Sequence, residues 1–189
     1  NLNLDVVPGS GLLAAVVPGA FDAWMLLLLN HGSKRLREIL EPAISIAKNG
    51  YPLVPNIINT INSVKELFLD DWKTSAKIYL PKGKLPKISQ VFKNECLAKT
   101  YEKLIDQAES FSSNRDKQIE KARQIWSSGF IAEEIDEFCK NNYFIDTSGA
   151  KHNGLLNGND LSSWSASEEK PKSFKYENYE VFKTDFWGQ

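Results

Sequence analysis

The sequence contains little cysteine, little histidine and no excess of charge of either sign. Its two cysteines and two histidines argue against a disulfide-rich scaffold and a Cys/His zinc site, and none of them lies in a CxxC or HExxH motif. Lys and Arg number 23 against 24 Asp and Glu, so the net charge is −1. This balance argues against nucleic-acid binding through a large basic surface.

The common motifs of nucleotide binding and nucleophilic catalysis are also missing. The chain has no GxGxxG, no GxxxxGK[ST] and no GxSxG. It has no long uninterrupted apolar run either, because the stretch 11–29 is broken by Pro18-Gly19 and Asp22, whereas a membrane span needs about 20 apolar residues. We therefore expect this stretch to form a loop followed by a buried helix.

The length and composition are those of a globular protein. Hydrophobic residues make up 42% and charged residues 25% of the 189 residues, which allows one domain, or two small ones, with a real core. The chain begins at Asn1 without an initiator Met or a signal segment, and it ends at Gln189 directly after a strand-like run. We therefore expect both ends to be cuts inside a longer chain.

Helical periodicity dominates the sequence between its two ends. Residues 1–17, marked by Gly and Pro, are expected to be an irregular lead-in segment, and residues 18–189 a helical region. The expected helices are 20–30, buried most of the way round, 36–47, kinked or divided at Pro42, 56–68, 94–111, 113–126 and 131–139. Their expected caps and stops are Ser33, Asn56, Asn94, Ser113, a left-handed Gly32, Gly50 and Gly129.

The last fifty residues are expected to be less regular. The stretch 141–158 is rich in Asn, Gly, Ser and Asp and is expected to be a loop, and Asn159 to cap a short turn after it. Residues 174–176 and 179–181 alternate like strands around Glu177-Asn178, which predicts a tight hairpin in which Asn tolerates a positive φ. The predicted fold class is mainly α with a terminal β-hairpin.

No side chain stands out as a reactive group. Each His is expected to be solvated rather than a base, and each Cys to be packed rather than a nucleophile, since no basic partner is visible nearby. A basic cluster and an acidic helix face are expected to be solvated, the first with a phosphate or carboxylate contact as its alternative. The Trp residues are expected to be core or interface anchors. The histidines are His31 and His152, and the cysteines are Cys96 and Cys139. The basic cluster is Lys34, Arg35 and Arg37, and the acidic helix face is Glu133, Glu134, Asp136 and Glu137. The Trp residues are Trp24, Trp126, Trp164 and Trp187.

The order of several short motifs resembles the γ-glutamyltranspeptidase family. Residues 17–24, which read VPGAFDAW, resemble the family's VPGxVxG(W/F), and residues 36–54 resemble its LxxLLxPAIxLAxxGFPV. The further matches are 79–101 with FLPDGxPPxxGxxFxNPxLAxTL, 126–135 with FYxGxIAxxI, 154–164 with GLLTxEDLAxY and 176–181 with YRGYEV. Each motif alone is weak, but their shared order from residue 17 to the C-terminus is specific.

The sequence also departs from the family pattern. Ala23 and Asn178 stand where the family commonly has Gly, and 110–125 resembles an insertion. The stretch 141–153 is longer than usual, and 182–189 replaces a segment rich in Pro, Ser and Gly. These differences indicate a divergent member.

The resemblance implies an N-terminal-nucleophile hydrolase of αββα layers, of which this chain is the helical part of the large subunit. Family members cleave themselves, and the new N-terminal Thr attacks a γ-glutamyl amide with its own α-amine as base. An Arg upstream of the VPG motif binds the substrate carboxylate. Neither the nucleophilic Thr nor the upstream Arg of the family is matched in this sequence. Asn1 carries no hydroxyl or thiol, and none of the five threonines lies in a cleavage context. The threonines are Thr60, Thr74, Thr100, Thr147 and Thr184.

We therefore assign this chain no catalytic, cofactor-binding or metal-binding residue and no cofactor, and expect it to be inactive alone. Its expected partners are the rest of the parent chain, both the upstream large-subunit segment and the small subunit, and a γ-glutamyl substrate for the parent. The resemblance implies a periplasmic or extracellular location. Two alternatives remain open: a non-catalytic helical interaction module, and a family acylase that acts on another amide. An excised piece would also leave an apolar face uncovered.

Overall fold

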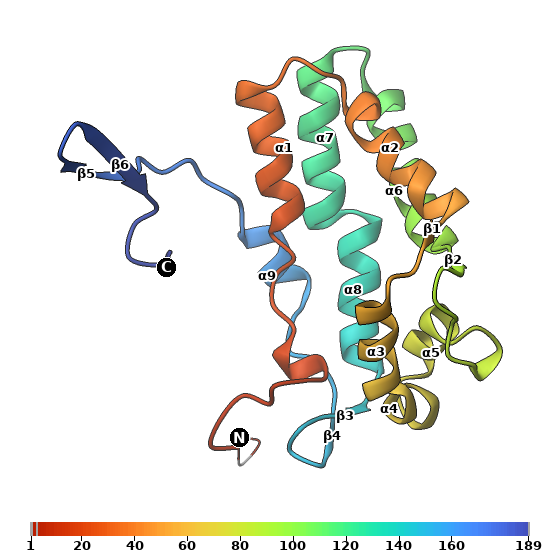
Figure 1. Cartoon of the computed structure of the whole chain (residues 1–189). Coiled ribbons are helices and arrows are strands. Elements are labelled where there is room, and N and C mark those ends of the chain that lie inside the picture. Colours follow the sequence, from red (N-terminus) through yellow and green to blue (C-terminus); the bar gives the residue numbers. More distant parts are fainter. Residues whose placement is uncertain (1, 3, 189) are drawn as a thin grey trace.

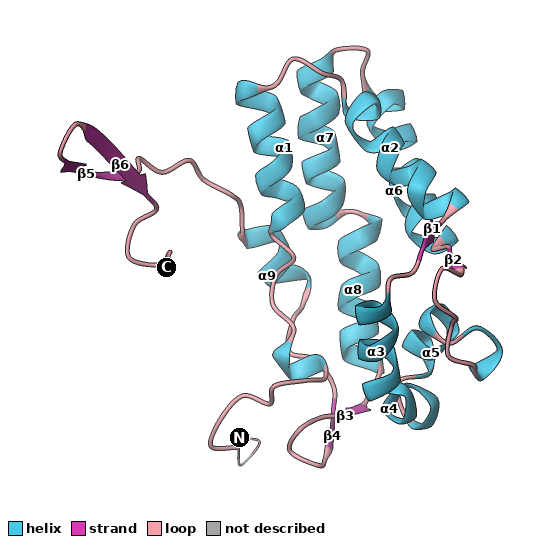
Figure 2. Cartoon of the chain, in the orientation of Figure 1, coloured by secondary structure: helices cyan, strands magenta, loops and turns pink. Residues whose placement is uncertain are grey.

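The computed structural model describes residue 2 and residues 4–188, which form a mainly helical fold (Figures 1 and 2). The predicted fold class, mainly α with a terminal hairpin, is confirmed. The helices are α1 (Ala20–His31), α2 (Leu36–Asn49), α3 (Pro55–Ser63), α4 (Lys65–Asp70), α5 (Lys73–Tyr79), α6 (Glu95–Phe111), α7 (Arg115–Ser128), α8 (Phe130–Asn141) and α9 (Gly158–Ser163).

The strands form three separate antiparallel pairs among the described residues. They are β1 (Tyr51–Pro52) with β2 (Val91–Phe92), β3 (Phe144–Ile145) with β4 (Lys151–His152), and β5 (Lys172–Tyr176) with β6 (Tyr179–Lys183). β1–β2 joins the chain after α2 to the chain before α6, and a small cluster of Leu53, Ile58 and Phe92 packs beside it. No larger sheet is present in the part of the chain that the structure describes.

The main core lies between α1, α2, α6 and α7. α7 is polar in composition, yet it contacts α1, α2, α6, α8 and α9 and buries Ile119, Ala122 and Ile125 on one side. These three residues recur at the helical interval of three, so they share a face. The buried side chains of the cluster are Phe21, Met25, Leu28, Leu36, Leu40, Ile44, Ala47, Ala98, Leu104, Ile105, Ala108, Ile119, Ala122, Ile125 and Ile131.

The end of α1 is held by Arg115 at the start of α7. The guanidinium of Arg115 donates to the carbonyls of Leu28, Gly32 and Lys34 and thereby ties the end of α1, and the chain just after it, to the start of α7. The prediction of a left-handed Gly32 is wrong, since its φ is −94°. A Cβ at this position would instead lie 2.8 Å from the Leu28 carbonyl oxygen, so close approach is what requires Gly.

Three of the predicted helix starts, at Ser33, Asn56 and Ser113, are placed differently in the structure. Asn94 does cap α6, because its side chain accepts the Leu97 N–H at 3.1 Å. At α7 the cap is Asn114, one residue after the predicted Ser113, since the Asn oxygen accepts the Lys117 N–H at 3.0 Å. Ser33 does not cap α2, which begins at Leu36.

In place of Ser33, the side chain of Glu38 reaches back to the N–H of Arg35 at 2.9 Å. Asn56 is not a cap either, since α3 begins with Pro55, whose fixed φ suits the first turn. The predicted helix 56–68 is divided into α3 and α4 at Val64, and α5 lies in a segment for which no helix was expected.

The middle of α2 is continuous. Pro42 lies inside a single helix, so the alternative of two short helices is wrong. Gly50, with a φ of 89°, ends α2 as expected, and Gly129 ends α7.

The segment 141–158, expected to be a loop, contains the β3–β4 hairpin. Strands of two residues are too short to show alternation, which explains why the sequence pattern missed them. The cap of α9 is Asn157, not Asn159, because the Asn157 side chain accepts the N–H groups of Asn159 and Asp160. In the last hairpin the positive φ of 52° falls on Glu177 rather than on Asn178.

The chain from 164 to 188, which we call the arm, leaves the helical body beside α1 and carries the β5–β6 hairpin away from it (Figure 1). Every residue of β5 and β6 is exposed. Phe174 and Val181 are paired across the hairpin, as are Tyr176 and Tyr179, so these four side chains share one face of the ribbon.

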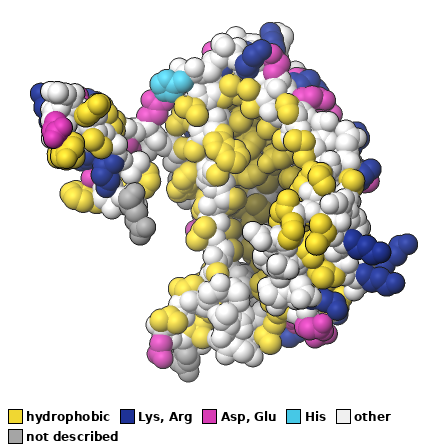
Figure 3. Space-filling model, viewed as in Figure 1, with side chains coloured by type: hydrophobic (Ala, Val, Ile, Leu, Met, Phe, Trp, Pro, Cys, Tyr) yellow, Lys and Arg dark blue, Asp and Glu magenta, His cyan; other side chains and the backbone are white. Residues whose placement is uncertain are grey.

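The helical body exposes an apolar surface of its own. α1 is not buried most of the way round, because Trp24 and Leu27 are 61% and 60% exposed. Ile39 and Ile46 of α2 are exposed as well. Figure 3 shows hydrophobic side chains gathered around a hollow on one face of the helical body and again on the hairpin. Among residues 2 and 4–188, no helix is both long and apolar enough to cross a membrane.

Candidate functional site

A largely buried ion pair joins α1 to α7, and a backbone hydrogen bond links it to the arm. Asp22 is 7% exposed, and Arg123 of α7 binds its carboxylate through two nitrogens, at 2.5 Å and 2.9 Å. The backbone N–H of Ala166 donates to the Asp22 Oδ2 atom at 2.7 Å. From sequence, Asp22 could be placed only near the start of the expected helix 20–30, and nothing in the local sequence indicates partners 101 and 144 residues away.

This arrangement keeps Asp22 ionised. Burial disfavours the charged carboxylate, but the hydrogen bonds from Arg123 and Ala166, with the charge of Arg123, outweigh it and hold the pKa of Asp22 below its ordinary value. The same pairing raises the pKa of Arg123. The site is therefore a permanently charged junction, suited to fixing structure rather than to exchanging protons at neutral pH.

The Asp22 pKa predicts how stability responds to acid. Because the unfolded chain takes up a proton on Asp22 at a higher pH than the folded chain, the stabilisation is complete above the ordinary carboxyl pKa of about 3.9 and is lost as pH falls through the lower folded value. Urea midpoints measured between pH 7 and pH 2 should fall less steeply below pH 4 in Asp22→Asn than in the unchanged protein. An identical acid slope in the two proteins would contradict this assignment.

A second buried carboxylate organises the turn between β3 and β4. The side chain of Asp146, 1% exposed, accepts the N–H and the hydroxyl of Ser148 at 2.9 Å and 2.6 Å and lies 2.7 Å from the Nδ1 atom of His152. The hydrogen bonds from Ser148 and His152 hold the pKa of Asp146 below its ordinary value despite burial. His152 is thus not simply solvated, which corrects the prediction.

This turn also binds the lead-in segment. The Thr147 hydroxyl accepts the N–H of Gly9 at 2.8 Å, and the backbone at Gly11 passes so close to Asp146 that a Cβ there would lie 2.7 Å from the Asp146 Cβ. Neutral His152 can donate its Nδ1 proton to Asp146, so the contact does not require a charged imidazole. The arrangement fastens two segments of chain. The Asp-Thr-Ser-Gly sequence is a turn signal that could have indicated it.

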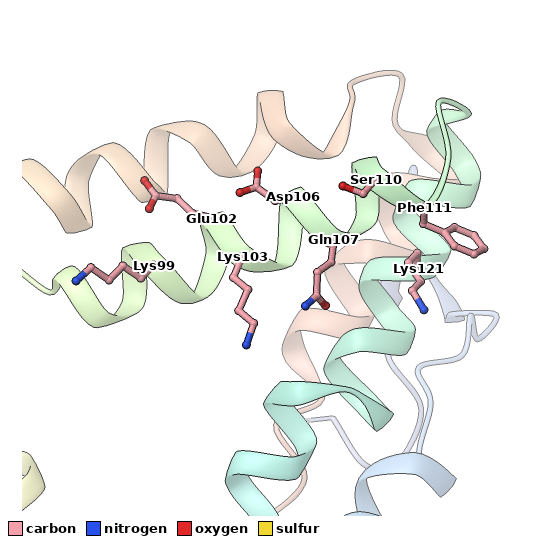
Figure 4. Close-up of a pocket in the computed structure, with 8 residues that line it drawn as sticks. All are labelled: Lys99, Glu102, Lys103, Asp106, Gln107, Ser110, Phe111 and Lys121. Carbon is pink, nitrogen blue, oxygen red and sulfur yellow. The ribbon is translucent and has the colours of Figure 1, made fainter.

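A surface groove of about 730 Å³ runs along α6 and faces α7 (Figure 4). It presents three Lys with Glu102 and Asp106, so its charges nearly balance. Lys103 lies 3.9 Å from the centre of the Phe130 ring, and Lys121 lies over Phe111. Each of these two ammonium groups therefore already has an aromatic partner. The groove residues are Lys99, Glu102, Lys103, Asp106, Gln107, Ser110, Phe111 and Lys121.

His31, Cys139 and Cys96 differ in their exposure. His31 is solvated, as predicted, and lies 3.0 Å from Glu168. Cys139 is packed as predicted, and burial, with Asp136 nearby, raises the pKa of its thiol. Cys96 is exposed, so its predicted packing role is wrong, because its position on α6 faces solvent.

The charged clusters make contacts within the chain. Arg37 binds the carboxylates of Glu109 and Asp106. Of the two contacts considered for the basic cluster, a phosphate or a carboxylate, the structure therefore shows the carboxylate contact. On α8 the acidic residues Glu133, Glu134 and Glu137 are exposed, as expected, whereas Asp136 accepts the N–H of Gly158 at 3.0 Å.

The Trp residues differ in their roles. Trp126 stacks on Phe21 with ring centres 4.2 Å apart and donates to the Pro18 carbonyl, which confirms it as a core anchor. Three further Trp residues are exposed and are therefore not core anchors: Trp24, Trp164 and Trp187. Their predicted role as interface anchors stays a prediction. Within the described residues, no three His, Cys, Asp or Glu side chains are grouped closely enough to hold a metal ion.

Comparison with known proteins identifies the class to which this arrangement belongs. A family model described as Gamma-glutamyltranspeptidase matches residues 2–189. The chain therefore belongs to the γ-glutamyltranspeptidase family, as its ordered motifs indicated.

Two curated relatives are proenzymes of this family. The chain is 27% identical over 191 residues to the "Glutathione hydrolase-like YwrD proenzyme" of Bacillus subtilis, a match that covers 96% of the chain and 31% of the relative. It is 23% identical over 170 residues to the "Glutathione hydrolase proenzyme" of Escherichia coli, covering 90% of the chain and 25% of the relative. The chain thus spans less than a third of the length of either.

Solved structures share the fold. A structure of LmbA2991 is 44% identical with a TM-score of 0.94, covering 98% of this chain and 32% of that one. The γ-glutamyltranspeptidase of Helicobacter pylori is 22% identical with a TM-score of 0.76, covering 97% and 46%. The second likeness, at this identity, shows the fold alone.

Proposed function

We propose that this chain is the helical part of the large subunit of a γ-glutamyltransferase-like enzyme, and that it supports the catalytic αββα layers without supplying the nucleophile. The parent would transfer or hydrolyse the γ-glutamyl group of glutathione-like amides. The observation that carries the proposal is the family match over residues 2–189, together with relatives that are named glutathione hydrolase proenzymes and are more than three times as long.

The environment of the Thr hydroxyls supports the absence of a nucleophile from this part. Thr60 and Thr100 donate to the carbonyls of Asn56 and Cys96 in their own helices. The Thr147 hydroxyl accepts the Gly9 N–H. An N-terminal nucleophile needs a hydroxyl beside a free α-amine. The prediction that Asn1 is not the nucleophile, because it carries no hydroxyl or thiol, concerns a residue outside those that the structure describes.

The exposed apolar surfaces of this chain favour a role in packing against the rest of the parent enzyme. Trp24 and Leu27 are exposed on α1. The hairpin also exposes an aromatic face, which consists of Phe174, Tyr176 and Tyr179 with Val181. Large exposed apolar surfaces of this kind mark protein interfaces. In the proposal, the upstream large-subunit segment and the small subunit cover them.

An assay with a chromogenic γ-glutamyl anilide tests the proposal. This chain alone should release no aniline above the rate in buffer, whereas a longer protein that carries it with a downstream Thr segment should release aniline. Turnover by the chain alone would refute the absence of a nucleophile. A longer protein that is cleanly folded and yet inactive toward every amide tested would favour the helical interaction module instead.

An acylase is the second candidate for the parent. Over 51 residues the chain is 39% identical to the "Acylase ACY 1 proenzyme" of Pseudomonas, a match that covers 27% of the chain. The two activities differ in the acyl group that the enzyme removes from the amide. Amides that carry another acyl group, used in the same assay, therefore separate them. Faster release from these amides than from the γ-glutamyl anilide would identify the parent as an acylase.

A further inference from the structure

The arm follows α1 and is attached to it at three successive points. Trp164 lies against Gly19, the Ala166 N–H donates to Asp22 at 2.7 Å, and the Glu168 carboxylate accepts from Asn30 at 2.8 Å. The attachments thus run from the N-terminal end of α1 to its C-terminal end as the arm proceeds. Beyond them the chain leads directly into β5, whose hairpin packs mainly on itself.

The three attachments differ in how well they exclude water. The Glu168 contacts with Asn30 and His31 are exposed, with side chains more than half accessible at Glu168 and His31. Water competes with such contacts, so they contribute little. The Asp22 side chain is 10% exposed, and its carboxylate accepts the Ala166 N–H and also binds Arg123 through two nitrogens. A hydrogen bond to a buried charge is among the stronger kinds.

The Trp164 contact depends on the absence of a side chain at Gly19. A Cβ built at Gly19 would overlap the six-membered ring of Trp164. The arm therefore begins flush against the first turn of α1, two residues before Ala166 meets Asp22. These two contacts fix both the position and the direction of the chain at its departure from the helical body.

We propose that Asp22 is the positioning residue of the arm: it holds the Ala166 backbone against α1, and Arg123 keeps it charged for this purpose. The hairpin has no other strong attachment among the described residues, so the direction in which its aromatic face points is set at this junction. The inference does not depend on the proposed activity, because it concerns the geometry of this chain.

The chain offers a matched control for a charge-neutralising substitution at Asp22. Arg37 binds Glu109 through two nitrogens, as Arg123 binds Asp22, but this pair joins α2 to α6 and does not touch the arm. Asp22→Asn and Glu109→Gln therefore remove the same charge from similar ion pairs. Only the first weakens the acceptor of the Ala166 N–H.

Hydrogen exchange measured on the 189-residue chain tests the proposal. In Asp22→Asn, exchange at Ala166 should rise about tenfold or more beyond any rise at the fully buried Leu104, because a bond to a charged acceptor is lost. In Glu109→Gln, exchange at Ala166 should rise no more than at Leu104. Cleavage after Glu168 and Glu169 by a glutamate-specific protease should accelerate in the first variant only.

Two further variants keep the test decisive if Asp22→Asn fails to fold. Arg123→Lys retains the Asp22 acceptor, so Ala166 should stay largely protected. Gly19→Ala displaces Trp164 but leaves the Asp22 acceptor in place, so exchange at Ala166 should rise by less than in Asp22→Asn while helical circular dichroism is retained. The proposal is overturned if exchange at Ala166 in Asp22→Asn rises no more than at Leu104, if Gly19→Ala or Arg123→Lys raises it about tenfold or more beyond Leu104 although the Asp22 acceptor is retained, or if Glu109→Gln releases the arm equally.

Discussion

Replacing Phe21 with Ala should lower the free energy of unfolding by about 3–5 kcal/mol. Phe21 is 2% exposed and stacks on Trp126, with ring centres 4.2 Å apart and planes 14° from parallel. Its ring also lies in the cluster that joins α1 to α6 and α7, so a truncated side chain leaves a cavity among helices that cannot easily close it. Denaturation by urea, followed by helical circular dichroism, measures the loss.

Phe186→Ala is the matched control for this prediction. The same side chain is removed, but Phe186 is 98% exposed, so the free energy of unfolding should change by less than about 0.5 kcal/mol. Equal effects of the two substitutions would mean that α1 does not pack on α7 as described. Because Phe21 belongs to the first motif shared with the family, the experiment also tests whether that motif is structural.

Replacing Gly50 with Ala should destabilise the protein by about 2–4 kcal/mol, from backbone strain and from overlap. The φ of Gly50 is 89°, a region that side chains disfavour, and a Cβ there would lie 2.5 Å from Val91 Cγ1 and 2.7 Å from the carbonyl oxygen of Phe92. Relief would require moving the backbone of β2. Since β2 leads directly into α6, the strain would reach the main core.

Gly149→Ala separates the two causes. Gly149 has a similar φ of 82°, but no atom lies within 4 Å of a Cβ placed there. This variant should therefore lose only the strain, about 1 kcal/mol. Thermal or chemical unfolding of both variants measures the difference, and a Gly149→Ala loss as large as that of Gly50→Ala would show that crowding by β2 plays no part.

Elements held by interactions between residues close in sequence can be predicted from the sequence, whereas those held by distant segments cannot. α6 was predicted with its cap because Asn94 acts on a residue only three positions away and the apolar stripe lies within one helix. The β5–β6 hairpin was predicted for the same reason, since its strands adjoin the turn that joins them. The loop between α8 and α9 was misjudged because β3 and β4 have two residues each and are held by Asp71 and Trp72 from α4–α5.

The candidate site shows the opposite case. Asp22 could be placed in the first turn of a helix from sequence alone, but its partners lie 101 and 144 positions further along the chain. His152 was expected to be solvated because the surrounding sequence is polar, whereas the turn folds it against Asp146. Neither pairing has a local signal, so neither could be inferred before the helices were packed.

By itself the sequence determined the helical periodicity, the approximate extents of α1, α2, α6, α7 and α8, the terminal hairpin and, through the order of its motifs, membership of the γ-glutamyltranspeptidase family. Only the tertiary structure decided which faces are buried: α1 was expected to be enclosed, yet Trp24 and Leu27 face solvent, while the polar α7 occupies the centre. The physical reason is that periodicity records how residues share a face of one helix. Burial depends on what other segments bring to that face.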